Sequence, residues 1–129
     1  MKKEQIDEHL KHILVYQDQL NKLGEDMKIQ RIELLSKQLV FIGRLASAFS
    51  ENYKQIYAKR KRMYAEAEIN AQPPRQARAE LAVAEIREEE AEAYGLMKRW
   101  NNAFDSTKEE INALKYKVKI DIEDGSNRQ

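Results

Sequence analysis

The sequence contains no cysteine, only two prolines and four glycines, and aromatic residues make up 8% of its 129 positions. Without cysteine the chain has no disulfide framework, no thiolate metal ligand and no cysteine nucleophile, and we expect a cytoplasmic protein. Four scattered glycines do not build a glycine-rich phosphate loop, and the sequence also lacks zinc-protease and serine-hydrolase motifs. We therefore expect a protein that is not an enzyme and carries no cofactor.

Long apolar runs and an excess of charge of one sign are also missing. No stretch of 18 apolar residues occurs, and charged residues follow Met1-Lys2-Lys3 where a signal peptide needs an apolar run. We expect neither a membrane-spanning segment nor export, and no membrane partner. The 23 Lys and Arg residues balance 22 Asp and Glu residues, which gives a formal net charge of +1. Because no overall positive field draws the chain to phosphate, only a local patch is a candidate nucleic-acid site.

The few glycines and prolines mark the ends of predicted helices. Apolar residues recur at helical spacing over positions 4–22, and Gly24 follows them in the position of a C-terminal cap. The pair Pro73-Pro74 should stop a second helix, because proline disfavours helical geometry in the residue before it. We predict a single all-α domain over 1–129, with helices at 4–22, 26–71 and 75–121, a Pro-Pro turn at 72–75 and a flexible tail at 123–129. A break of the third helix near Asp105 is the alternative, since the polar residues around it are poor in helix interiors.

Two stripes of mainly apolar residues advance by alternating steps of three and four, the heptad repeat of a coiled coil. The first stripe contains Ile32, Leu35, Leu39, Ile42, Ala46, Phe49, Tyr53, Ile56, Arg60, Met63, Ala67 and Asn70. The second contains Ala79, Val83, Ile86, Glu90, Ala93, Met97, Trp100, Phe104, Thr107, Ile111, Leu114 and Val118. We predict a long antiparallel coiled-coil helical hairpin in which the numbers of facing residues add up to roughly 147. A wider apolar face at the start of the second helix predicts that the shorter N-terminal helix completes a three-helix bundle at the base.

Two charged residues interrupt these stripes in the same part of the hairpin. Arg60 occupies the first stripe and Glu90 the second, and the pairing about the Pro-Pro turn places them close together. A charged pair in such a position sets the register of two helices more than it adds stability. We predict that Arg60 and Glu90 form a register pair in the core.

The second predicted helix also carries a cluster of tyrosines and cations that is a candidate binding face. Its members are Tyr53, Lys54, Tyr57, Lys59, Lys61, Arg62 and Tyr64. Cations bind phosphate and aromatic rings stack on bases, so nucleic acid is one candidate partner. The acidic run at positions 88–90 lies close to this cluster in the predicted hairpin, and it favours a protein partner or self-association instead.

A histidine pair near the N-terminus has the spacing of two metal ligands on a helix. His9 and His12 lie three positions apart, next to Asp7 and Glu8. Structural zinc needs four ligands, and this region offers no ordered set of that size. We expect a surface pair and no metal site.

The last 70 residues or so resemble the small helical accessory proteins that temperate bacteriophages encode in their recombination regions. The resemblance lies in Ala91-Glu92-Ala93-Tyr94, Trp100 with Phe104, the segment from Glu110 to Lys115, and the preceding segment from Arg62 to Glu68. It implies a non-enzymatic accessory protein that acts on DNA-processing machinery or on a host protein.

Together these patterns predict a helical interaction protein that forms a homo-oligomer or binds a protein partner. One alternative is a nucleic-acid-binding accessory module that uses the basic face from Lys54 to Tyr64. Another is a chaperone-like helical hairpin that grips unfolded segments at its tip. The tip contains the polar residues Gln72, Arg75 and Gln76 and offers no apolar clamp, which makes this third hypothesis the weakest.

Overall fold

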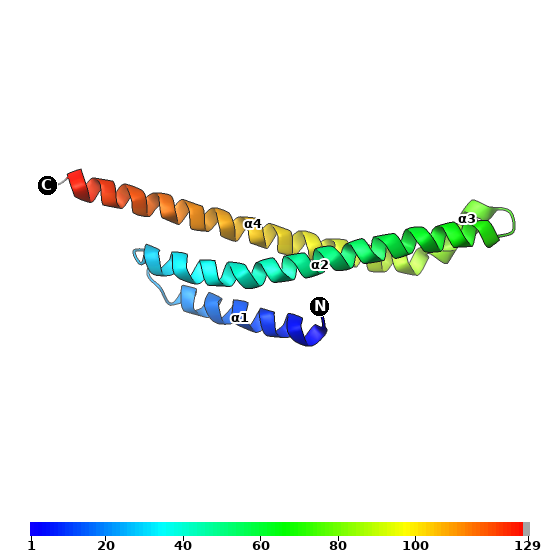
Figure 1. Ribbon diagram of the computed structural model, residues 1–129, viewed down its shortest axis with the longest axis horizontal. Coiled ribbons are helices and arrows are strands. Elements are labelled where there is room, and N and C mark those ends of the chain that lie inside the picture. Colours follow the sequence, from blue (N-terminus) through cyan, green and yellow to red (C-terminus); the bar gives the residue numbers. More distant parts are fainter. Residues whose placement is uncertain (128–129) are drawn as a thin grey trace. The chain divides into compact units, whose positions relative to one another are not determined.

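The computed structural model describes residues 1–127, and the regular structure among them is entirely helical. The helices are α1 (Lys3–Asn21), α2 (Lys28–Asn70), α3 (Arg75–Ala82) and α4 (Ala84–Asn127), as Figure 1 shows. The prediction of an all-α fold is confirmed. A long α2 is expected because positions 28–70 contain no proline and a single glycine. In the described part of the chain, no helix has the length and apolar character needed to cross a membrane.

The connection between α1 and α2 differs from the predicted glycine cap. Helix α1 ends at Asn21, one residue earlier than predicted, and Lys22 follows it in right-handed helical geometry. Gly24 does not have a positive φ, so it is not a left-handed cap. Its carbonyl oxygen instead accepts a hydrogen bond of 3.1 Å from the N–H of Met27. This turn delays the start of α2 to Lys28 rather than position 26.

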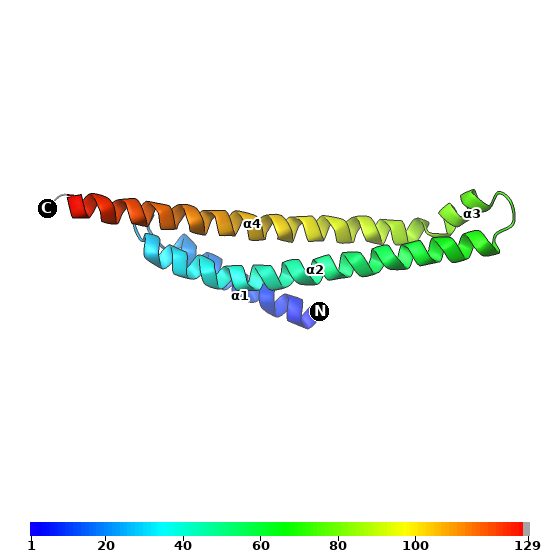
Figure 2. The same ribbon diagram turned by 45° about the horizontal axis from the view of Figure 1, so that its top comes forward.

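The prediction of one helix over 75–121 is wrong at Val83. Helix α3 ends at Ala82, Val83 has φ −106° and ψ 8°, and α4 begins at Ala84. Figure 2 shows that α3 is tilted away from the axis of α4. Val83 is completely buried, and its β-branched side chain loses rotamer freedom inside a helix. Valine is therefore one of the weaker helix formers, although this preference alone does not predict a break.

Helix α4 is otherwise longer and more regular than the sequence predicts. It continues through Asp105 without interruption, so the alternative break at that position does not occur. The predicted flexible tail at 123–129 is wrong for residues 123–127, which continue α4, and residues 128 and 129 lie outside the described residues. Helix α2 ends at Asn70, next to the predicted boundary, and α3 begins at Arg75 after the two prolines.

The chain divides into two compact units, each of which contains part of α2 and part of α4. Unit 1 comprises Met1–Ala46 and the chain from Trp100 onward. In this unit α1 lies beside the first part of α2 (Figure 1). A guanidinium nitrogen of Arg31 donates to the carbonyl oxygen of Leu20 at 3.2 Å, and Gln38 Nε2 donates to the carbonyl oxygen of Ile13 at 3.1 Å.

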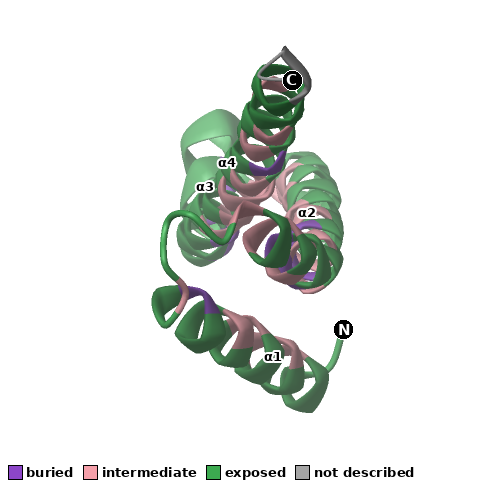
Figure 3. Ribbon diagram, turned by 90° about the vertical axis from the view of Figure 1, so that its left-hand side faces the viewer, coloured by how far each residue is buried: buried purple, intermediate pink, exposed green. Residues whose placement is uncertain are grey.

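One apolar cluster in the core of unit 1 contains a buried residue from each of its three helices. Leu20 of α1, Leu35 of α2 and Ile111 of α4 form one apolar cluster. Leu45 is completely buried, and Gln38 is a buried polar residue whose amide nitrogen donates to α1. Figure 3 shows that most of α1 is exposed or half-buried, and Leu20 is its one fully buried side chain.

Unit 2 comprises Ser47–Arg99 and contains the end of α2, all of α3 and the start of α4. Figures 1 and 2 both show the α2 and α4 segments of this unit side by side. Its buried apolar residues are mostly small: Ala79, Val83, Ile86 and Ala93. Small side chains let the two helices approach closely, but they remove little apolar surface from water.

The two predicted stripes correspond to the covered sides of the helices. Every residue of the first stripe is buried or half-buried except Asn70, which ends α2. Every residue of the second stripe is buried or half-buried. The heptad spacing therefore identified the packed face of each helix within both units.

Candidate interaction face

Three tyrosine rings from two helices come together on the surface of unit 2. Tyr53 and Tyr57 lie one helical turn apart on α2, with ring centroids 6.2 Å apart. Tyr94 of α4 meets Tyr53 edge to face, with a centroid distance of 5.4 Å and an interplanar angle of 60°. Edge-to-face contact at this distance is a favourable arrangement of aromatic quadrupoles. Tyr57 and Tyr94 nevertheless stay 37% and 45% exposed, so the cluster faces solvent.

Lysine ammonium groups lie above two of these rings. Lys61 Nζ is 4.8 Å from the ring centroid of Tyr57, and Lys98 Nζ is 5.9 Å from that of Tyr94. The attraction between a cation and the negative face of a ring holds each ammonium near its tyrosine. We call Tyr53, Tyr57, Lys61, Tyr94 and Lys98 the tyrosine face. It offers two positive charges and exposed aromatic surface from two neighbouring helices.

The structure brings Arg60 and Glu90 together at the edge of this face. Arg60 Nε donates a hydrogen bond to Glu90 Oε2, and the two side chains are only 17% and 16% exposed. The Arg60 guanidinium carbon also lies 5.3 Å from the ring centroid of Tyr57. A largely buried pair of this kind is costly to break, because removing one partner leaves the other charge without compensation.

The other predicted face residues separate into two groups. Lys54, Lys59 and Arg62 are exposed, and in the described part of the chain they form no salt bridge. Tyr64 is half-buried and lies close to charged residues instead of to the other tyrosines. Loss of hydration raises the pKa of the Tyr64 hydroxyl, Glu68 and Glu80 raise that pKa further, and Arg87 lowers it. The predicted cluster is therefore not one continuous site.

Sequence reasoning missed two members of the tyrosine face, Tyr94 and Lys98. Both belong to α4, and each directly follows a residue of the second stripe. The numbers of Tyr53 and Tyr94 add up to 147, the value predicted for facing residues. A search of the residues that flank both stripes, and not only of the basic run on α2, would have found them.

The basic run of α2 at residues 59–62 and the acidic run of α4 at residues 88–90 do not form a continuous series of salt bridges in the described chain. Besides Arg60 and Glu90, unit 2 contains a salt bridge of 3.1 Å between Arg87 and Glu80, and none among its described residues joins Lys59 or Lys61 to α4. Consecutive residues on a helix point in different directions, so only one cation of the run faces the second helix.

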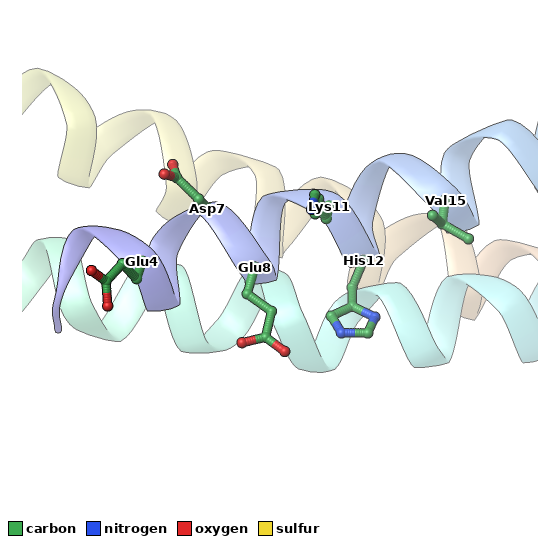
Figure 4. Close-up of a pocket in the computed structure, with 6 residues that line it drawn as sticks. All are labelled: Glu4, Asp7, Glu8, Lys11, His12 and Val15. Atoms are coloured by element: carbon green, nitrogen blue, oxygen red, sulfur yellow. The ribbon is translucent and has the colours of Figure 1, made fainter.

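Both imidazoles of the histidine pair pack against one aromatic ring. The His12 imidazole stacks on Phe41 at a centroid distance of 4.4 Å and an angle of 10°, and His9 lies 5.6 Å from the same ring. Figure 4 shows Glu8 and His12 pointing to one side of α1 and Asp7 to the other. Among the described residues, no group of three or more ligating side chains is placed to hold a metal ion.

A hollow of about 760 Å³ lies in unit 1 where α1 joins α2. Its lining includes Lys28 and Arg31, but both cations are already engaged. Lys28 forms a salt bridge of 2.6 Å with Asp121, and Arg31 donates to the carbonyl oxygen of Leu20. Lys117 adds a third cation to the lining, and the carboxylates of Glu25 and Asp26 lie in the same lining.

The end of unit 2 next to the Pro-Pro turn exposes two large apolar side chains. Ile69 of α2 and Leu81 of α3 are each 77% exposed, more than any other large apolar residue in the described range. Ile69 directly precedes Asn70, the last residue of the first stripe, and Leu81 lies midway between Ala79 and Val83 of the second, so neither side chain belongs to a packed stripe. The polar tip predicted for the chaperone-like hypothesis thus has apolar residues beside it.

Comparison of the chain with protein-family models, with curated proteins and with solved structures found no match.

Proposed function

We propose that the chain is a single helical domain whose long helices form an antiparallel coiled-coil hairpin, with α1 completing a three-helix bundle at its base. The burial of both heptad stripes supports this architecture. So do the contacts of Tyr53 with Tyr94 and of Gly43 with Phe104, since the numbers in each pair add up to 147.

On this scaffold the chain acts as a non-enzymatic interaction protein, and the tyrosine face binds its protein partner. The observation that carries this function is the exposure of Tyr57 and Tyr94 beneath Lys61 and Lys98. Tyrosine supplies large contact area with few rotatable bonds, and tyrosine is enriched among the residues that dominate binding energy. The resemblance to phage accessory proteins is consistent with this role and with a location in the bacterial cytoplasm.

Nucleic acid is the alternative partner, and it is favoured by Lys59, Lys61 and Arg62, which form no salt bridge with any described residue. Two features favour a protein instead. Lys61 and Arg60 already lie against the ring of Tyr57, so this ring is not an open platform for a base. Arg60 is also neutralised by Glu90.

Affinity capture from the lysate of a bacterium that carries a prophage tests the proposed function. The wild-type chain is compared with two double variants. Lys61→Ser/Tyr94→Ser removes the centre of the tyrosine face. The control, Lys59→Ser/Arg62→Ser, removes two other cations of the basic run on α2 and leaves the tyrosine face intact. We expect the first variant to lose the captured protein and the control to retain it. Equal capture by all three would contradict the role of the tyrosine face, and capture of nucleic acid that is lost in the control would favour the alternative.

A further inference from the structure

The two lysines of the tyrosine face carry positive charge that no carboxylate of the described chain neutralises. Lys61 and Lys98 are exposed, and neither forms a salt bridge with a described residue. On a helix, the surface neighbours of a side chain lie three and four positions away. Those positions hold Tyr57, Ala58, Tyr64 and Ala65 around Lys61, and Tyr94, Gly95, Asn101 and Asn102 around Lys98. Because neither set contains an acidic residue, both ammonium groups can donate hydrogen bonds to carboxylates of another molecule.

The two sides of the helix pair in unit 2 differ in charge balance. Residues that directly follow a stripe position share the side of the tyrosine face, and residues that directly precede one lie on the opposite side. The opposite side balances four cations, Lys59, Arg62, Arg78 and Arg99, against the carboxylates of Glu66, Glu85, Glu89 and Glu92. The side of the tyrosine face has the four cations Lys54, Lys61, Arg87 and Lys98 against only Glu68 and Glu80. The surplus of positive charge therefore lies with the tyrosines.

Two further carboxylates of unit 2 belong to neither side. Glu51 and Glu88 each lie midway between two stripe positions, so they point away from the packed face of their helices. Neither is a surface neighbour of Lys61 or Lys98 on its helix, and Glu51 accepts a hydrogen bond of 3.5 Å from Gln55. They do not neutralise the two lysines of the tyrosine face.

The surface beside the exposed rings is low, which leaves the rings open to an apolar side chain. Ala91 lies one turn before Tyr94 on α4 and is exposed, and Ala58 directly follows Tyr57 on α2. Gly95 directly follows Tyr94, and a Cβ added to it would have nothing within 4 Å. A partner can therefore approach the edges of both rings without displacing other side chains.

We propose that the tyrosine face binds an acidic peptide segment of its protein partner, in which carboxylates lie on both sides of an apolar side chain. This inference rests on the proposed function and specifies the chemistry of the partner. Lys61 and Lys98 pair with the carboxylates, and Tyr57 and Tyr94 cover the apolar side chain. Both of these rings are neighbours of Tyr53, so one short segment reaches the two lysines from α2 to α4.

A long polyanion such as nucleic acid fits this face less well. Exposed Glu88 and Glu92 of α4 repel phosphates that extend beyond the two lysines. The ring of Tyr57 also lies against Lys61 and Arg60, so a base cannot stack on it freely. A short segment that combines carboxylates with an apolar side chain uses the charges and the rings together.

Selection from random-sequence peptides displayed on the surface of a carrier tests this proposal without a named partner. The purified full chain is the bait, and Lys61→Gln/Lys98→Gln is the bait for a parallel selection. We expect the wild type to enrich peptides in which Asp or Glu residues flank an apolar residue, and the variant to lose this enrichment. Enriched peptides without an excess of acidic residues, or the same enrichment on both baits, would overturn the proposal.

Fluorescence anisotropy with one synthetic enriched peptide then measures each contribution. Replacing its Asp and Glu residues by Asn and Gln should weaken binding about tenfold, and Lys61→Gln/Lys98→Gln in the protein should do the same. Tyr57→Ser/Tyr94→Ser should weaken binding at least about tenfold, because it removes the aromatic contact area. Raising NaCl from about 0.05 M to about 0.5 M should also weaken binding. Affinity that none of these changes reduces would contradict the proposal.

Two control variants separate local charge from net charge. Lys61→Arg/Lys98→Arg keeps both positive charges and should retain binding. Arg78→Gln/Arg99→Gln removes the same net charge from exposed positions on the opposite side, and it should bind like the wild type. Circular dichroism checks that every variant stays helical. An equal loss of affinity in Arg78→Gln/Arg99→Gln would show that net charge, and not the tyrosine face, attracts the peptide.

The remaining outcomes distinguish this inference from the proposed function. If no acidic peptide binds but the tyrosine face still captures a protein from the lysate, the partner chemistry is wrong and the proposed function stands. If Lys61→Ser/Tyr94→Ser changes neither peptide binding nor capture, both fail. If an oligothymidine binds the tyrosine face more tightly than the enriched peptide does, nucleic acid replaces the acidic peptide as the partner.

Discussion

Units 1 and 2 are built from parts of the same two long helices, but the contacts inside each unit are of different kinds. Unit 1 buries large aliphatic side chains, with Leu20, Leu35 and Ile111 in one cluster and Leu45 completely enclosed. Unit 2 buries Ala79, Val83, Ile86 and Ala93, and it places a charged pair where an apolar residue is expected. Apolar burial stabilises in proportion to area, whereas a charged pair mainly selects one alignment. The comparison teaches that one heptad pattern can stabilise the fold in one segment and fix the alignment of the two helices in the next.

The largest effect should come from the apolar core. Leu45→Ala removes a completely buried side chain from unit 1, and we expect a loss of about 3 kcal/mol in the free energy of unfolding. Val83→Ala removes fewer buried atoms from unit 2 and should cost about 2 kcal/mol. Urea denaturation followed by circular dichroism measures both. Leu14→Ala, at a position 67% exposed, is the control and should change stability by less than about 0.5 kcal/mol. A larger loss for Val83→Ala than for Leu45→Ala would reverse the contrast between the units.

The charged pair should show strong coupling. Arg60→Ala or Glu90→Ala alone leaves a largely buried charge unpaired, and we expect each to cost about 1–2 kcal/mol. The double variant should cost no more than either single change, because no charge is left uncompensated. A double-mutant cycle from thermal melts measures the coupling. Losses that simply add would show that the two residues act independently and do not set the register.

Gly43 of α2 and Gly95 of α4 should respond differently to alanine. Gly95 of unit 2 has nothing within 4 Å of an added Cβ, so Gly95→Ala should stabilise the fold by about 0.5–1 kcal/mol through lower backbone entropy. In unit 1 an added Cβ on Gly43 would lie 3.2 Å from Phe104 Cε2, so the ring must shift to accept it. We expect Gly43→Ala to give no such gain. Equal stabilisation by both substitutions would indicate that unit 1 is packed no more tightly than unit 2.

The smallest effect should appear at high pH. The pKa of Tyr64 is raised above its usual value of 10.0, chiefly because the hydroxyl loses hydration. The folded state then holds this proton more tightly than the unfolded state does, so the contribution of Tyr64 to stability is present below about pH 10 and is lost as the pH rises through the raised value. Ultraviolet titration of tyrosinate in the wild type and in Tyr64→Phe isolates this residue. A titration difference centred at or below the usual tyrosine value would contradict the assignment.

Much of the fold follows from local properties of the sequence. The all-α class, the separation of α2 from α3 by two prolines, and the covered side of each long helix were predictable from propensity, proline geometry and heptad spacing. The bend at Val83 was not, because a valine that continues a heptad stripe carries no local signal of a break. The continuation of α4 to Asn127 was missed for the opposite reason, since Gly125 and Ser126 are weak helix formers that the long helix nevertheless includes.

The candidate site was predictable only in part. Sequence analysis found Tyr53, Tyr57 and Lys61, because they crowd together on one helix. It also identified Arg60 and Glu90 as an unusual pair within the stripes. Tyr94 and Lys98 joined the site through the second helix, and Tyr64 was separated from it by charged neighbours.

The sequence by itself determined that this protein is helical, where its longest helices are divided, and which side of each helix is covered. These properties depend on spacing along one helix, which the order of residues contains directly. Only the tertiary structure decided that Tyr94 and Lys98 join Tyr53 and Tyr57 on one face, and that among the described residues no cation of the basic run other than Arg60 forms a salt bridge across unit 2. Those outcomes depend on the rotation of one helix about its axis relative to its neighbour, and packing between helices fixes that rotation.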